Sequence, residues 1–167
     1  MNVTQRILSL CVPAVLCLLP GCTHPPAADE AGVHQWISDF TKAFEARDAN
    51  AVIALYAPDV VAFDLVPPLE YTDRNAYAKD FAGYFAQFKG PLGLEYRDMH
   101  ITVSGDLAVI EGLERMTGTM TNGQAVDIWM RDTTALRKVD GKWLDFHDHL
   151  SVPADLATGK AALDLKP

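Results

Sequence analysis

Asp64 is a side chain in this sequence that could act as a base on a small molecule. It lies within an apolar, β-branched segment, residues 60–66. Loss of water raises the pKa of a carboxyl group in such a setting and makes its carboxylate a stronger base. We therefore consider Asp64 a candidate catalytic base. The alternative is a structural role, in which its oxygens bond a turn or pair with an arginine.

Arg131 could recognise a negatively charged group. It lies in the middle of an expected strand, two residues after Trp129. A buried guanidinium is costly unless it is paired, and its planar fork matches a carboxylate. Three interpretations stay open for Arg131: binding of a ligand carboxylate, exposure to solvent, or an internal ion pair. The acidic partners available for an internal pair are Asp64, Glu111 and Glu114.

His147 and His149 could transfer protons, because an unperturbed histidine has a pKa of about 6.5. Alternate residues on a strand share a face, so the pair could also ligate one metal ion. Further ligands such as Asp145 or His100 are not placed by the sequence, and we predict no metal and no cofactor. We take His149 as a catalytic candidate and His147 as a ligand contact. For both, a structural or exposed histidine is the alternative.

The elements that must position these residues change character near residue 90. Before it, apolar residues recur every three or four positions across 32–47 and 75–88, which predicts helices. A short helix beginning at Asn50 and a strand over 60–66 lie between them. After it the period is two, and turn signals separate four expected strands, at 92–103, 107–120, 125–138 and 142–152. The class is therefore α+β, with helices packed on a curved antiparallel sheet.

Two segments carry a resemblance to a known family. They are residues 60–69, VVAFDLVPPL, and the stretch from Trp129 to Pro153 that contains RKVDGKW and HDHLSVP. With the order of elements, they resemble the SnoaL-like and ketosteroid isomerase-like branch of the nuclear transport factor 2-like superfamily. The second segment also resembles the association domain of calmodulin-dependent kinases. The resemblance implies a cone-shaped fold with a cavity between the sheet and the helices.

The resemblance also implies which residues face that cavity. Trp129, Arg131 and His149 are expected to point into it, with Asp64 as the base of an isomerase-like site. That site would also need a hydroxyl, which Tyr56, Tyr77 or Tyr84 could supply, and we count Tyr84 among the ligand-binding residues. The isomerase's oxyanion pair, a tyrosine with a protonated carboxylic acid, is not recognisable in the sequence.

Two hypotheses for function follow. The first is a cavity protein that binds a small apolar molecule bearing a carbonyl or carboxylate group, without defined catalysis. The second is a cofactor-independent isomerase, lyase or hydrolase that uses Asp64 or His149 as general acid or base. The second requires Asp64, Arg131 and His149 to converge in one closed cavity. Whether the protein is an enzyme stays open at this point.

Partners are suggested by charge and by the resemblance. The formal net charge of −8 argues against nucleic acid, whose binding depends on basic patches. The resemblance implies a homodimer formed through the sheet face that points away from the cavity. The apolar residues expected on that face are Ile128, Met130, Leu136, Leu144, Phe146 and Leu150.

The N-terminus predicts export. Arg6 precedes an apolar run of about 13 residues, shorter than the roughly 20 that span a membrane, as in a signal peptide. Leu19-Pro20-Gly21-Cys22 resembles the bacterial lipobox, which implies lipid attachment at Cys22, and Thr23 implies the periplasmic face of the outer membrane. We divide the chain into a signal peptide (1–21), a tether (22–31), a SnoaL-like domain (32–153) and a C-terminal tail (154–167).

Overall fold

The computed structural model describes residues 26–167. The predicted signal peptide, the lipid attachment at Cys22 and the start of the tether lie outside these residues. The elements follow in the order α1 (Pro26–Glu45), α2 (Ala49–Ile53), β1 (Tyr56–Phe63), α3 (Arg74–Phe85), β2 (Phe88–Ser104), β3 (Leu107–Met120), β4 (Ala125–Val139), β5 (Lys142–Ser151), β6 (Ala154–Asp155) and β7 (Lys160–Ala161). No helix within residues 26–167 is long and apolar enough to cross a membrane.

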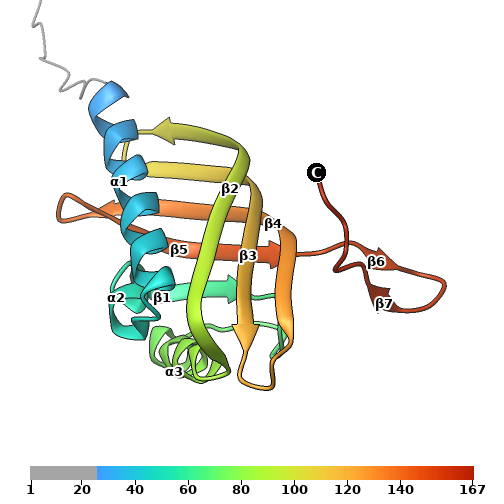
Figure 1. The fold of residues 1–167 in the computed structure, drawn as a ribbon. Coiled ribbons are helices and arrows are strands. Elements are labelled where there is room, and N and C mark those ends of the chain that lie inside the picture. Colours follow the sequence, from blue (N-terminus) through green and yellow to red (C-terminus); the bar gives the residue numbers. More distant parts are fainter. Residues whose placement is uncertain (1–25) are drawn as a thin grey trace, which may run out of the picture.

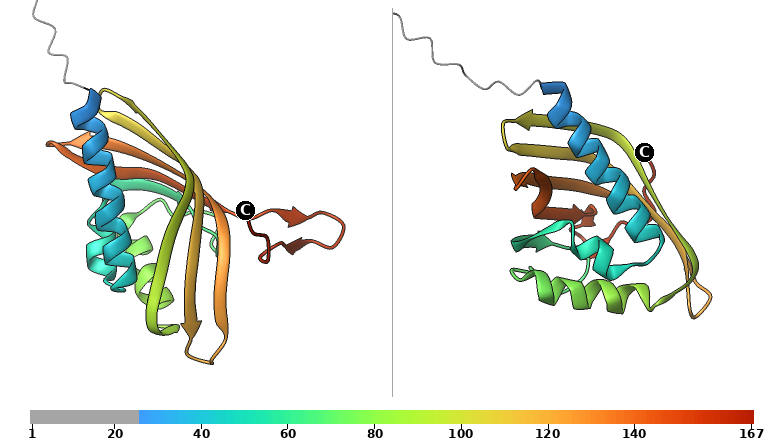
Figure 2. Two further views of the ribbon diagram at one scale, coloured as in Figure 1. Left: turned by 45° about the horizontal axis from the view of Figure 1, so that its top comes forward. Right: turned by 90° about the vertical axis from the view of Figure 1, so that its left-hand side faces the viewer.

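Five strands form one curved sheet in the order β1-β5-β4-β3-β2. Strands β2 to β5 pair antiparallel, and β1 joins the edge parallel to β5 (Figure 1). Figure 2 shows the helices gathered on one side of the curved sheet. We call this side the concave face and the other the convex face. The predicted α+β class, with helices on a curved antiparallel sheet, is confirmed.

The helices are held by an aromatic core. Helix α1 buries Trp36, Phe40 and Phe44 at spacings of four, so that they form one stripe facing the sheet. The rings of Trp36 and Phe40 stack with centroids 5.3 Å apart, and Phe44 meets Phe85 of α3 edge-on, also at 5.3 Å. Asp73 caps α3, and Asp48 caps α2, one residue before its first residue, Ala49.

A β-bulge in β5 decides which side chains face the helices. Thr134 pairs with Asp148 and Leu136 with Asp145, so β5 carries one residue more than β4 across this stretch. The extra residue reverses the alternation of faces. Trp143 and Asp145 are buried before the bulge, and Asp148 is buried after it. Strict alternation, which we assumed for this strand in the sequence, is therefore wrong across residues 145–148.

The C-terminal tail folds back onto the sheet. Strands β6 and β7 form a hairpin that projects beyond the main sheet (Figure 1). After it, Lys166 forms an ion pair with Asp127 at 2.9 Å, and Arg97 donates a hydrogen bond to the carbonyl oxygen of Pro167 at 3.3 Å. Leu165 and Trp129 line the same shallow depression. The tail therefore covers part of the convex face.

Candidate functional site

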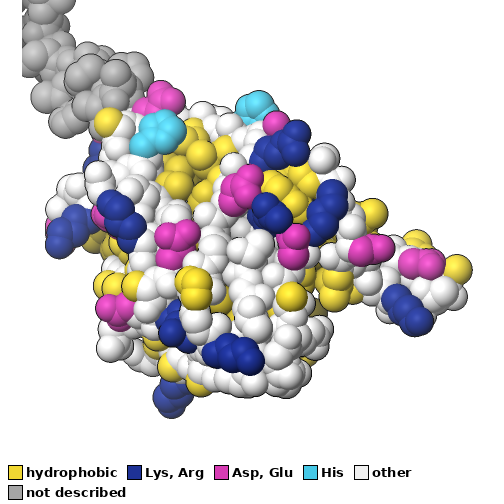
Figure 3. Space-filling view, viewed as in Figure 1, with side chains coloured by type: hydrophobic (Ala, Val, Ile, Leu, Met, Phe, Trp, Pro, Cys, Tyr) yellow, Lys and Arg dark blue, Asp and Glu magenta, His cyan; other side chains and the backbone are white. Residues whose placement is uncertain are grey.

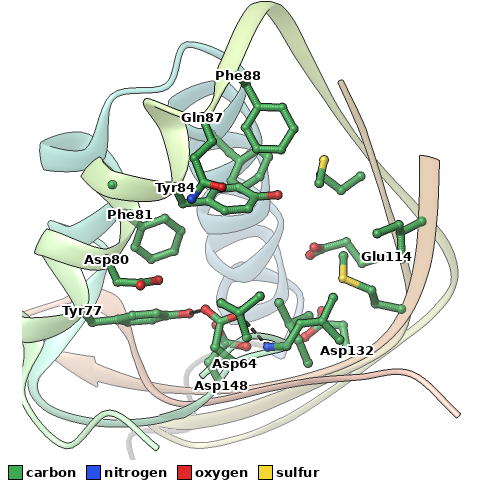
Figure 4. Close-up of a pocket in the computed structure, with 18 of the residues that line it drawn as sticks. Asp64, Tyr77, Asp80, Phe81, Tyr84, Gln87, Phe88, Glu114, Asp132 and Asp148 are labelled. Atoms are coloured by element: carbon green, nitrogen blue, oxygen red, sulfur yellow. Dashed lines mark hydrogen bonds between the residues drawn. The ribbon is translucent and has the colours of Figure 1, made fainter. Parts of the chain in front are cut away.

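A cavity of about 640 Å³ lies between the helices and the concave face of the sheet. This volume is typical of a site for a small organic ligand. Strands β3, β4 and β5 form one wall, and α1 and α3 form the other (Figure 4). Most of the lining is apolar or aromatic: Trp36, Phe40, Phe44, Leu65, Phe81, Phe88, Met116, Met120, Val126, Ile128, Met130 and Leu150.

Of the residues proposed from the sequence, Asp64 and Tyr84 line this cavity. Trp129, Arg131, His147 and His149 do not, so the expectation that Trp129, Arg131 and His149 point into it is wrong. The cavity side of β4 carries the even-numbered residues instead. Alternation along a strand defines two sets of residues, but it does not say which set faces inward.

The four remaining candidates lie on or near the convex face. Trp129 packs under the guanidinium of Arg115, 5.8 Å from its ring centroid, while Arg131 and His149 are exposed. His147 is half-buried, with Nδ1 2.9 Å from the carbonyl oxygen of Val61. Asp64, Arg131 and His149 therefore do not converge, and an enzyme built on those three is excluded.

The predicted dimer surface is wrong for the same reason. Ile128, Met130 and Leu150 line the cavity, and Leu136 is fully buried. These side chains belong to the inside of the protein and leave no apolar dimer face of the predicted composition. The homodimer itself stays a prediction.

A different set of acidic groups meets Asp64 in the cavity. Glu114 on β3, Asp132 on β4 and Asp148 on β5 all line it and are all buried. In Figure 4, Asp148 lies beside Asp64 at one end of the cavity, and Glu114 reaches in from the sheet wall. The sequence held a signal for these residues, because each interrupts an otherwise apolar set of alternate residues. Asp132, for example, follows Ile128 and Met130.

Tyrosine hydroxyls hold two of these carboxyl groups. Tyr77 of α3 donates to Oδ2 of Asp64 at 2.8 Å, and Tyr56 of β1 donates to Oδ2 of Asp148 at 2.9 Å. The backbone N–H of Leu65 donates to the other oxygen of Asp64 at 2.5 Å. Two tyrosine–aspartate pairs therefore lie in one apolar cavity, each joining different elements of the fold.

Burial sets the proton affinities of the acids. It raises the pKa of Asp148 to about 8, with a contribution from Asp132 and an opposing hydrogen bond from Tyr56. It raises the pKa of Asp132 to about 6, while the bond from Thr134 Oγ1, at 3.1 Å, opposes the shift. At pH 7 Asp132 is mostly ionised and Asp148 mostly protonated. The cavity therefore holds acid and base forms side by side.

The other two cavity acids also have raised pKa values. Burial is the main cause for Glu114, whose pKa lies well above its ordinary value, with contributions from Asp132 and Asp148. Burial also raises the pKa of Asp64, and the hydrogen bonds from Tyr77 and Leu65 oppose that rise. These two bonds favour the ionised form of Asp64, which is the form that a base requires.

Asp145 lies close to this cluster but does not line the cavity. It is fully buried, and neither of its carboxyl oxygens has a hydrogen-bond partner. Burial holds its pKa well above the ordinary value, and Asp148 and Asp132 add to the effect. We interpret Asp145 as a neutral acid that adds no charge to the site. Among residues 26–167, no group of three histidine, cysteine or acidic side chains is arranged to hold a metal ion.

Comparisons with known proteins place the chain in a family. The sequence model of the SnoaL-like domain matches residues 33–155, and the chain belongs to this family. A nuclear transport factor 2-like protein of unknown function from Pseudomonas putida KT2440 is 33% identical. It superimposes with a TM-score of 0.77 over 84% of this chain and 98% of its own. No curated protein matches the chain.

Two more distant structures share the fold. One, from Novosphingobium aromaticivorans, is provisionally described as a scytalone dehydratase. It is 18% identical over 75% of this chain and 84% of its own, with a TM-score of 0.68. The other, from Shewanella frigidimarina, is provisionally described as a ketosteroid isomerase. It is 22% identical over 72% of this chain and 94% of its own, with a TM-score of 0.61.

Proposed function

We propose that this protein is a cofactor-independent enzyme that moves a proton on a small, mostly apolar molecule carrying a carbonyl oxygen. The observation that carries the proposal is the pairing of Tyr77 with Asp64 and of Tyr56 with Asp148 inside one apolar cavity. Two carboxyl groups whose surroundings separate their proton affinities are the typical parts of an acid–base site.

The roles follow from the environment of each acid. Asp64, held by Tyr77 and Leu65, takes the proton from the carbon next to the carbonyl, so that the C–H bond breaks and an O–H bond forms on Asp64. Protonated Asp148 donates a hydrogen bond to the carbonyl oxygen as negative charge develops there. In a β,γ-unsaturated carbonyl compound, return of this proton from Asp64 to the γ carbon moves the double bond and gives an isomerisation. In a β-hydroxy carbonyl compound, the C–O bond breaks instead and the hydroxyl group takes the proton from Asp64 and leaves as water, which gives a dehydration.

The lining also favours a particular functional group on the substrate. The sequence left open a ligand carboxylate bound by Arg131, but Arg131 is exposed and outside the cavity. Asp148 and Glu114 offer carboxyl groups to the ligand. When ionised, these groups repel an anion, and when protonated, they donate a hydrogen bond to a neutral oxygen. An uncharged carbonyl is therefore the better fit.

The acid–base proposal can be tested with 5-nitrobenzisoxazole, whose ring opens when a base removes its ring C–H proton and the N–O bond breaks. We expect the protein to accelerate this reaction above an equal concentration of acetate. Asp64→Asn should lose about 100-fold or more of that rate. Binding of the neutral dye N-phenyl-1-naphthylamine should be retained, and the exposed turn variant Asp106→Asn should match the unchanged protein.

Either of two results would overturn the acid–base assignment. One is a wild-type rate no higher than that of Asp64→Asn. The other is a joint loss of rate, dye binding and cooperative unfolding in that variant, which would make Asp64 a structural residue.

A second candidate function is binding without chemistry. One observation favours it: the hydroxyls of Tyr56 and Tyr77 are already bonded to protein carboxyl groups, so these two pairs are formed without a ligand. Dye binding with no acceleration of ring opening in the wild-type protein would select this function.

We further propose that the protein is exported and anchored through a lipid on Cys22, most simply at the periplasmic face of an outer membrane. The support is the sequence of residues 1–23. Labelling with radioactive palmitate in a bacterial host should mark the wild-type chain and not Cys22→Ser. Equal labelling of both chains would exclude attachment at Cys22.

A further inference from the structure

Three carboxyl groups form a diagonal line across the concave face of the sheet. Glu114 on β3 pairs with Met130, and Asp132 lies two residues further along β4. Asp132 in turn pairs with Leu150, and Asp148 lies two residues further in the same direction on β5. Diagonal neighbours of this kind have backbones about 7–8 Å apart, within reach of each other's side chains. We call Glu114, Asp132 and Asp148 the acidic stripe.

Glu114 is the member of the stripe that points most clearly to a ligand. It is only 6% exposed, yet it lines the cavity, and its carboxyl group points into the empty space (Figure 4). The Tyr96 side chain lies beside it. A tyrosine hydroxyl has one hydrogen to donate, so it can satisfy only one of the two carboxyl oxygens. The other oxygen therefore faces the cavity, where a ligand can supply the donor.

The charged groups around the cavity are almost all acidic. The acids come from every side: Asp64 after β1, Asp80 on α3, and the acidic stripe on β3, β4 and β5. Among the described lining residues the basic one is Lys79, an exposed residue of α3. The hydroxyls of Tyr56, Tyr77, Tyr84 and Tyr96 complete the titratable set. An anion entering this cavity meets like charge, whereas a cation meets unpaired carboxyl groups.

The opposite wall suits a cation as well. Tyr84 projects from α3 into the cavity across from Glu114 (Figure 4), and the rings of Phe44 and Phe88 lie 6.3 and 5.0 Å from its own. Aromatic faces attract cations through their quadrupole, most strongly where water is excluded. A positively charged group between Tyr84 and Glu114 would therefore be attracted from both sides.

This inference rests on the proposed function, in which the cavity is the ligand site. We infer that the ligand carries a protonated amine seated against Glu114 and the rest of the acidic stripe. The apolar body of the ligand lies against the aromatic residues of α1 and α3. Binding of the amine favours the ionised forms of Glu114 and Asp132, so affinity for the amine rises with pH. The pKa of Asp132 is about 6, so this rise begins near pH 6, while Asp148, with a pKa of about 8, keeps the proton that the proposed function requires.

Three dansyl amides that differ only at the end of a five-carbon chain test this inference. One ends in an amine, one in a methyl group and one in a carboxylate, and the dansyl fluorescence reports entry into an apolar site. The purified full chain should bind the amine at pH 7.5 about tenfold or more tightly than the methyl compound, and the carboxylate more weakly than either. Between pH 6 and pH 8 the amine should gain affinity while the methyl compound should not.

Glu114→Gln is the decisive variant, because it removes the charge and keeps the shape. We expect it to lose the preference for the amine and to bind the methyl compound as the wild type does. The matched control is Glu111→Gln, an exposed residue of the same strand, which should change nothing. If Glu114→Gln does not fold, Asp132→Asn replaces it, with the same loss of preference expected.

The possible failures can be told apart. Equal affinity for the amine and methyl compounds, or a preference that survives Glu114→Gln and Asp132→Asn, overturns the amine inference. If the methyl compound then still binds and 5-nitrobenzisoxazole is still opened, the proposed function stands without it. If none of the three amides binds, the cavity is not a ligand site, and the proposed function fails with the inference.

Discussion

The two faces of the sheet differ in how their charged side chains are paired. On the convex face, Arg115 donates to both Asp127 oxygens, at 2.9 and 3.0 Å, and to Glu95 at 3.1 Å. Figure 3 shows acidic and basic side chains next to one another on the side of the molecule drawn there. On the concave face, three buried carboxyl groups and the half-buried Asp64 line a cavity whose described lining contains no buried basic side chain.

This difference indicates that the functional site lies on the concave face. Exposed ion pairs contribute little, because water and salt screen them. A buried carboxyl group without a cation destabilises the ionised folded state, and such groups gather at functional sites because their shifted proton affinities are useful there. Arg131 and His149, which were proposed as site residues from the sequence, are exposed to solvent on the convex face.

The largest effect should come from filling the place opposite the bulge of β5. Insertion of one alanine between Ala135 and Leu136 gives Phe146 a partner on β4, so that a regular strand places Asp145 and Asp148 on opposite faces. We expect loss of the cooperative thermal unfolding transition, followed by circular dichroism. Insertion of one alanine after Leu156, exposed in the C-terminal hairpin, should leave the transition in place. An unchanged transition after the insertion in β4 would contradict the role given to the bulge.

Matched leucines on the two faces sharpen the comparison. Leu136 on β4 is fully buried, whereas Leu107 on β3 is 53% exposed. Leu136→Ala should lower the free energy of unfolding by about 2–5 kcal/mol, because it leaves a cavity in a packed core. Leu107→Ala should change it by no more than about 0.5 kcal/mol. Urea denaturation measures both, and similar losses in the two variants would contradict the assignment of faces.

The contributions of Asp148 and Asp127 to the free energy of unfolding should change with pH in opposite directions. The pKa of Asp148 is raised to about 8, so the folded state holds this proton more tightly than the unfolded state. Stability from this group is present at low pH and falls as pH rises from about 4 to about 8, by about 1.4 kcal/mol per pH unit. Asparagine has no proton to lose, so the free energy of unfolding of Asp148→Asn should rise relative to that of the wild type across that pH range.

Asp127 on the convex face supplies the opposite sign. Hydrogen bonds from Arg115 and Lys166 lower its pKa, so its stabilising effect is present at neutral pH and is lost as the solution is acidified. The Asp127→Asn variant should therefore have a lower free energy of unfolding than the wild type near pH 7, and the difference should disappear near pH 3. Urea denaturation at pH 3, 5, 6.5 and 8 measures both variants, and parallel pH curves for Asp148→Asn and the wild type would refute the burial argument.

The smallest effect should come from the convex residues that the sequence had suggested. Arg131→Ala and His149→Ala should leave the rate of 5-nitrobenzisoxazole opening and the affinity for N-phenyl-1-naphthylamine within twofold of the wild type. Both side chains are exposed and outside the cavity, so removing them leaves its lining intact. A loss of tenfold or more in either variant would mean that a second site lies on the convex face.

Much of the architecture could be predicted from the sequence. The expected strands 107–120 and 125–138 coincide closely with Leu107–Met120 and Ala125–Val139, because Asn-Gly and Asp-Gly turns mark hairpin ends strongly. The helix expected over 75–88 ends at Phe85 instead, since Phe88 already pairs with Met120 in the sheet. Local turn chemistry was reliable here, and the tertiary pairing moved the boundary.

The candidate site was predicted less well. Asp64 and Tyr84 line the cavity as expected, but Glu114, Asp132 and Asp148 were not proposed as a set. Alternation separates the residues of β4 into two sets, with Trp129 and Arg131 in one and Met130 and Asp132 in the other. The second set is the more apolar, but the expectation rested on the resemblance, which placed the first set inward.

The sequence by itself determined the period of each segment and the turns between segments, because these depend on neighbouring residues and backbone preferences. Only the tertiary structure decided which face of the sheet the helices cover, since that depends on the total apolar surface buried by distant elements. It also decided, through one extra residue in β5, that Asp148 turns inward to meet Tyr56 and Asp132. The raised proton affinity of these acids arises from that burial, which no single segment can produce alone.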